Sequence, residues 1–100
     1  MNKQQVDSIW MVSFRPETHV MFRELVDEAV LLDLRTEHYL GLDQSATAFW
    51  LAITQEPSLE SAAQRLLQEF EVAESALRAD LLAFVADLQK RALVRVADAD

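Results

Sequence analysis

The sequence has no cysteine, one glycine and two prolines in 100 residues. Without cysteine the chain forms no disulfide and has no thiol nucleophile, and a reducing cytoplasm is its expected location. The single glycine, Gly41, excludes a glycine-rich phosphate loop. There is no run of about 18 apolar residues, so no membrane-spanning helix is predicted. The polar stretch from Met1 to Ser8 is not followed by the apolar region and cleavage site of a secretory signal.

Positive charge is also scarce. Nine lysines and arginines stand against 17 aspartates and glutamates, which gives a formal net charge of −8. Proteins that bind nucleic acids present a basic surface to the phosphate backbone. The charge therefore argues against nucleic acid and against an anionic membrane as partners, and it favours neutral or cationic ones.

The patterns of a catalytic or metal site are missing as well. The two histidines, His19 and His38, lie in separate segments and lack the spacing that places two ligands on one helix face. His38 follows Glu37, but an exposed turn histidine is the simpler interpretation. Serine hydroxyls such as that of Ser58 fit helix starts better than nucleophilic chemistry. We therefore predict no catalytic residue, no metal and no cofactor, and we do not expect an enzyme.

Hydrophobic residues make up 51% of the chain, which is enough for one core, and the first part of their pattern predicts strands. Three short apolar segments are separated by polar links of two and three residues, which is typical of antiparallel hairpins. The sequence therefore predicts a three-stranded antiparallel meander. The segments are residues 20–26, 29–34 and 38–42, and the links are residues 27–28 and 35–37.

Alternation with period two divides the middle strand into two faces. Val30, Leu32 and Leu34 share one face, and Leu31 and Asp33 share the other. Both faces thus contain apolar side chains.

After Asp43 the apolar spacing becomes helical. A first helix capped by Ser45, a second capped by Ser58 and a third, longest helix are predicted. A short strand is expected over residues 93–96. The apolar positions of the helices are Ala46, Phe49, Trp50 and Ile53; Leu59, Ala62, Ala63, Leu66, Leu67 and Phe70; and Leu77, Leu81, Phe84, Val85 and Leu88.

Three strands followed by three helices predict an α+β, winged-helix-like domain, because the last two helices have helix-turn-helix proportions. We expect residues 1–19 to form a partly disordered N-terminal arm, in which residues 9–14 make a loose extra strand or a packed segment. Residues 20–96 form the predicted domain, and residues 97–100 form an acidic tail.

Several short motifs follow one another in a specific order. They are Glu28–Leu34, His38–Asp43, Ala48–Trp50, Ser58–Glu60, Glu69–Val72, Leu77–Leu81 and Leu88–Val94. Each is loose alone, but together they resemble the PqqD-like family over residues 20–94. The chain departs from the family pattern at Glu37 and Ala92, where glycines are usual, and at Ala73, where the N-cap is usually acidic. Because glycine readily adopts positive φ, we expect altered turn geometry at the two glycine positions.

The resemblance implies a domain that binds the leader region of a ribosomally made precursor peptide and presents it to a modifying enzyme, such as a radical-SAM protein or a leader peptidase. Exposed strand edges capture extended peptides as additional strands. We expect the third strand to be the free edge, opposite the third helix. The candidate peptide-binding residues are His38, Tyr39, Leu40, Gly41 and Leu42 on the strand, and Arg78, Ala79, Leu82 and Val85 on the helix.

Some interpretations stay open. Gly41 either lets a partner backbone approach or marks a bulge or a tight crossing near Trp50. Arg78 pairs either with an acidic leader residue or with Glu74 on its own helix. The whole chain could instead be a winged-helix DNA-binding regulator, although the third helix has few basic residues. It could also be a structural adaptor whose edge strand pairs with its own copy, so both a monomer and a homodimer are compatible with the sequence.

Overall fold

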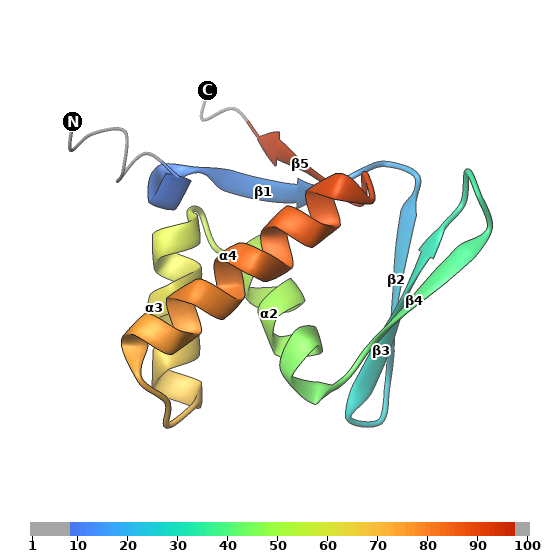
Figure 1. The fold of residues 1–100 in the computed structure, drawn as a ribbon. Helices are drawn as coiled ribbons and strands as arrows, with labels where there is room; N and C mark the ends of the chain where they lie inside the picture. The colour runs from blue at the N-terminus through green and yellow to red at the C-terminus, as the bar shows by residue number, and fades with distance from the viewer. Residues whose placement is uncertain (1–8, 98–100) are drawn as a thin grey trace.

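The computed structural model describes residues 9–97, which form one short 3-10 helix, five strands and three α-helices (Figure 1). The predictions for residues 1–8 and 98–100, within the predicted arm and the acidic tail, concern residues outside the described range. In chain order the elements are η1 (Ile9–Met11), β1 (Ser13–Pro16), β2 (Val20–Leu25), β3 (Glu28–Asp33), β4 (His38–Leu42), α2 (Gln44–Gln55), α3 (Leu59–Glu69), α4 (Glu74–Lys90) and β5 (Val94–Ala97).

The strands form two antiparallel sheets. β2, β3 and β4 make a meander in that order, and three helices follow it, which confirms the predicted α+β fold. β1 pairs with β5, and Phe14 stands opposite Val96. The two segments whose partners the sequence did not indicate therefore pair with each other. The division into an arm and a domain at residue 20 stays a prediction, but β1 lies before that boundary and its partner strand after it.

The helix starts follow from local side-chain chemistry. The Oδ1 atom of Asp43 accepts a hydrogen bond from the Ala46 amide at 2.8 Å, so Asp43 caps α2 and the predicted cap Ser45 is wrong. Both residue types are good caps, and Asp43 comes first after β4. Ser58 caps α3 as predicted, with its hydroxyl 3.1 Å from the Ser61 amide. α4 begins after Ala73 without a side-chain cap.

The core lies between the helices and one face of the meander. Trp50 of α2, Leu66 of α3 and Leu81 of α4 are almost fully buried, and Phe14 of β1 joins them with 1% of its surface exposed. No helix within residues 9–97 is long and apolar enough to cross a membrane.

The predicted alternation of β3 is confirmed, and the structure shows which face is inside. Ala29, Leu31 and Asp33 are buried against the helices, whereas Val30 and Leu32 are only half-buried. The meander therefore keeps a second, partly exposed apolar face.

Two turns keep a backbone conformation that favours glycine, although they contain none. Glu37 has φ 61° and Ala92 has φ 58°. The Glu37 amide donates to the Asp33 carbonyl at 2.7 Å, and the Leu93 amide after Ala92 donates to the Leu88 carbonyl at 2.9 Å. The expected change of turn geometry is thus not observed. The left-handed conformation is retained, and an L-residue there costs roughly 1–2 kcal/mol.

Candidate functional site

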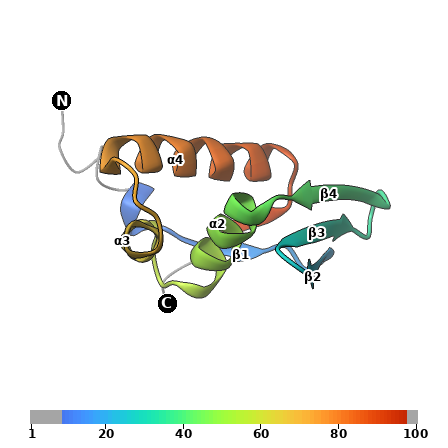
Figure 2. The same ribbon diagram turned by 90° about the horizontal axis from the view of Figure 1, so that it is seen from below.

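β4 is an edge strand of the meander. Among the described residues it pairs with β3 alone. It is the strand of the meander closest to α4, and the sheet projects beyond the C-terminal end of that helix (Figure 2). Tyr39 has 75% of its surface exposed, whereas Leu42 is buried. Such an edge leaves backbone donors and acceptors for one more strand.

The side chains of β4 alternate between the two faces of the meander. Leu40 stands beside Leu31, on the face that packs on the helices, and Tyr39 stands beside Leu32 on the opposite face. A peptide that adds to β4 follows the same alternation, so every second side chain points towards the helical side.

Gly41 has no structural reason to be glycine within the described part of the molecule. It pairs regularly with Val30, so the strand has no bulge there. Its φ is not positive, and a Cβ atom added to it meets nothing within 4 Å. The alternatives of a bulge and of a tight crossing near Trp50 are therefore wrong. The backbone at Gly41 is therefore not covered by any described side chain, and it lies in the edge strand β4.

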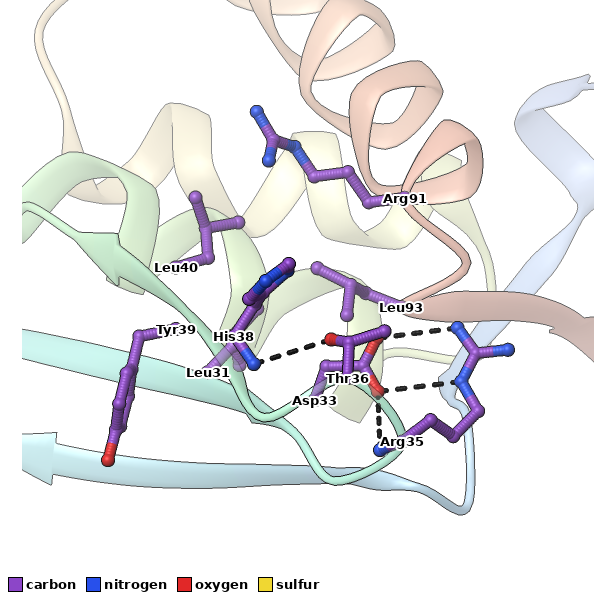
Figure 3. A pocket seen from close by; sticks show the side chains of 9 residues that line it. All are labelled: Leu31, Asp33, Arg35, Thr36, His38, Tyr39, Leu40, Arg91 and Leu93. Carbon is purple, nitrogen blue, oxygen red and sulfur yellow. Dashed lines mark hydrogen bonds and ion pairs between the residues drawn. The ribbon is translucent and has the colours of Figure 1, made fainter.

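A hollow of about 250 Å³ opens between the start of β4 and the end of α4 (Figure 3). Apolar side chains and the β3–β4 turn form one part of it, and Arg91 from the helix end forms another. Its lining residues are Leu31, Asp33, Arg35, Thr36, His38, Tyr39, Leu40, Arg91 and Leu93.

A second hollow, of about 440 Å³, lies where β4 ends and α2 begins, against the side of α4. The rings of Phe49 and Phe84 meet there edge to face, with their centroids 5.7 Å apart. The two hollows share no residue, but both use the same side of α4. The second is lined by Asp43, Ser45, Ala46, Phe49, Asp80, Ala83, Phe84 and Asp87.

Asp33 fixes the shape of the first hollow. Its carboxylate accepts the Arg35 amide at 2.9 Å and the Arg35 guanidinium at 3.3 Å and 3.4 Å, and these hydrogen bonds lower the pKa of Asp33 below its usual value. His19 lies 4.0 Å from the same carboxylate and donates from Nε2 to the Ala92 carbonyl at 2.9 Å. The start of β2, the end of β3 and the end of α4 are thereby linked.

Arg78 lies on the opposite side of α4. Its guanidinium donates to Glu60 of α3 at 2.8 Å and 2.9 Å and to Glu74 at 2.8 Å, which confirms the pairing with Glu74. It also lies 4.6 Å from the ring centroid of Trp10. The hydrogen bonds that Arg78 donates lower the pKa of Glu60 to about 2, and the same bonds to the Glu60 carboxylate raise the pKa of Arg78 above its usual value. Arg78 therefore connects α4 with α3 and η1.

The structure does not bring the predicted helix residues together with the predicted strand residues. Leu82 is 37% exposed, as expected, and Ala79 is exposed, but neither lines the two hollows. Val85 is 2% exposed and belongs to the core. Their role in peptide binding stays a prediction.

The residues that sequence reasoning missed lie on the other flank of the apolar stripe of α4. They recur at helical spacing, which was visible in the sequence, but the sequence does not indicate which flank faces β4. They are Asp80, Ala83, Asp87 and Arg91, and Phe84, which was predicted as part of the apolar stripe itself, lies beside them.

Together, fold and site define a small winged-helix-like domain with a free strand edge beside a grooved helix. The chain belongs to the PqqD family, because the family model for coenzyme PQQ synthesis protein D matches residues 28–94.

Two solved structures are similar to this chain over most of its length. One is TbiB1 in complex with the TbiA(β) leader peptide, at 27% identity and a TM-score of 0.76, covering 86% of this chain and 99% of that one. The other is lasso peptide synthetase B1 complexed with the leader peptide, at 25% identity and a TM-score of 0.75, covering 83% and 98%. No curated protein matches the chain.

Proposed function

We propose that this protein binds the leader region of a ribosomally synthesised precursor peptide as an added strand on β4. The observation that carries the proposal is the β4 edge, with which no strand within residues 9–97 pairs, together with the two hollows beside it. Main-chain hydrogen bonds to an edge strand give affinity, and pockets for alternate side chains give specificity. The similarity to two proteins solved with leader peptides supports the same assignment.

The protein acts in this proposal as a binding partner in the cytoplasm, and a separate enzyme modifies the presented peptide. A leader peptidase and a radical-SAM protein are both candidates for that enzyme, as the resemblance to the PqqD-like family implies. The α4 side that carries Phe84 and Arg91 faces the bound peptide, and the side that carries Arg78 packs against α3.

Fluorescence anisotropy with labelled peptides tests this function. The probes are synthetic N-terminal segments of the short peptides encoded beside the gene, with the TbiA(β) leader as a second probe. We expect saturable binding that Gly41→Pro abolishes, because proline removes a backbone donor and cannot continue the added strand. Gly41→Ala is the matched control and retains binding, because its Cβ atom has open space.

A folded Gly41→Pro protein that binds its peptide like the wild type overturns the edge as the site. Methylation of the peptide backbone gives an independent check, since only one of the two alternating sets of amide groups faces β4 in an added strand. If the edge pairs with its own copy instead, sedimentation shows a dimer in the absence of peptide, and Gly41→Pro converts it to a monomer.

A further inference from the structure

The hollow at the start of β4 has an apolar floor and a cationic rim. Leu31 and Leu93 are almost fully buried at its base, and Leu40 adds to them from β4. Arg35 from the β3–β4 turn and Arg91 from the end of α4 also line it, and Figure 3 shows the Arg35 guanidinium against Asp33 and the Arg91 guanidinium on the other side of the view. The site therefore combines a surface for methylene groups with two guanidinium groups.

The lining of this hollow holds more basic than acidic side chains, unlike the chain as a whole, which carries a formal charge of −8. Two arginines line it with the single carboxylate of Asp33, and Asp87, which pairs with Arg91, lies outside the lining. Asp33 stays ionised at neutral pH, because its hydrogen bonds with Arg35 lower its pKa. An anion that enters the hollow is therefore attracted by the guanidinium donors that these two ion pairs leave unused.

Both arginines keep donors available. Arg91 donates from Nε to Asp87 at 3.0 Å, and its two terminal nitrogens have no hydrogen-bond partner within residues 9–97. Arg35 uses Nε and Nη2 for Asp33 and leaves Nη1 without a partner in the same range. About half of each side chain is exposed. A guanidinium group with free terminal donors binds a carboxylate in a planar, directional manner.

A strand on β4 places one of its side chains in this hollow. His38 and Leu40 point to the helical face of the sheet, so the peptide residue beside them on that face points the same way. Its first carbon atoms contact the buried leucines, and its end reaches Arg91.

We infer that this hollow binds a glutamate side chain of the leader peptide, with its methylene groups on Leu31, Leu40 and Leu93 and its carboxylate on Arg91. The inference rests on the proposed function, which supplies the strand on β4. It predicts one glutamate in the leader peptide, at a position that lies beside His38 at the start of β4.

The test uses a leader segment that binds the wild-type protein, resynthesised with glutamate and with glutamine at each position in turn. At one position, the peptide with glutamate binds with a Kd roughly tenfold lower than the peptide with glutamine, as expected for a charge-assisted hydrogen bond at a partly exposed site. Added salt weakens this preference. Arg91→Gln reduces it to about twofold or less, and Arg91→Glu turns it into a preference for lysine.

Lys90→Gln is the matched control. It removes the same charge from the neighbouring position at the end of α4, but Lys90 does not line the hollow. The glutamate preference therefore survives in this variant. An equal loss in Lys90→Gln and Arg91→Gln shows only a long-range effect of charge and overturns the assignment. The assignment is also overturned if a peptide with phenylalanine or tyrosine at that position binds more tightly than the peptide with glutamate.

The two proposals fail in different ways. If no leader segment binds the wild-type protein, the proposed function and the glutamate site are both wrong. If a segment binds and Gly41→Pro abolishes binding, but no position distinguishes glutamate from glutamine, the glutamate site alone is wrong.

Discussion

The two sheets of this protein differ in how many of their large side chains are buried. In the β1–β5 pair, Phe14 and Val94 are buried in the core, and the flanking chain is tied down by hydrogen bonds from the Glu17 amide to the Leu93 carbonyl and from the Leu59 amide to the Val12 carbonyl. In the meander, one face packs on the helices while Met21 and Tyr39 on the other remain exposed. The β1–β5 pair is therefore part of the core, whereas the meander leaves one edge strand and one face exposed.

This contrast separates stability from binding. A side chain of the β1–β5 pair contributes through burial, and burial of large apolar side chains is the main favourable contribution to folding. The free edge of β4 contributes little to folding, because its outward backbone groups are solvated, and those groups are available to a peptide. Substitutions in the two sheets should therefore affect different measurements.

The largest expected effect is that of Phe14→Ala. Removal of this buried ring lowers the free energy of unfolding by about 3–5 kcal/mol, measured by urea denaturation. Met11→Ala is the control on the same segment, and because Met11 is 73% exposed the change stays within about 0.5 kcal/mol. The contrast between the sheets breaks down if folded Phe14→Ala protein loses peptide affinity as completely as Gly41→Pro.

Intermediate effects are expected at the two left-handed turns, one in each half of the molecule. Glu37→Gly and Ala92→Gly each raise the free energy of unfolding by roughly 1 kcal/mol, because glycine relieves the unfavourable positive φ. Asp27→Gly is the comparison, since Asp27 has φ 64° but aspartate tolerates this region better, and its gain is smaller. Thermal unfolding of the three variants measures the differences, and a loss of stability in Ala92→Gly contradicts the strain argument.

The smallest effect concerns the ion pair that holds η1, α3 and α4 together beside β1. The folded pKa of Glu60 is about 2, below its ordinary 4.5, so the pair stabilises the fold above pH 4.5 and loses this contribution as the pH falls towards 2. Because 40% of the Glu60 side chain is exposed, we expect Glu60→Gln to lower the free energy of unfolding by only about 0.5 kcal/mol at pH 7.

Urea denaturation at pH 7 and at pH 2.5 checks both the size and the sign of this effect. The deficit of Glu60→Gln shrinks at the lower pH, because the wild-type carboxylate is then becoming protonated. A deficit of the same size at both pH values attributes the effect to packing instead of charge.

The sequence was sufficient for those parts of the fold that depend on local patterns. Period-two segments with short links predicted the meander, and the helical stripes predicted α2, α3 and α4. Ser58 was recognisable as a cap, but the choice between Asp43 and Ser45 depended on where β4 ends.

Long-range packing was not predictable in the same way. Both faces of β3 are apolar, and only the packing of α2 determines that Leu31 points inwards. α4 likewise has Arg78 on one flank of its apolar stripe and Arg91 on the other, with the flank towards β4 fixed by how the helix crosses the fold. This is why β4 was correctly placed at an edge, whereas Asp80 and Arg91 were missed.

The pairing of β1 with β5 also orders events during synthesis. The meander and the helices are joined by short links and can form as soon as they leave the ribosome, since local contacts close quickly. β1 is made before any of them, but its partner strand is the last described element to emerge. A nascent chain that has completed α4 therefore already contains all three strands of the meander, while β1 still lacks the strand that pairs with it.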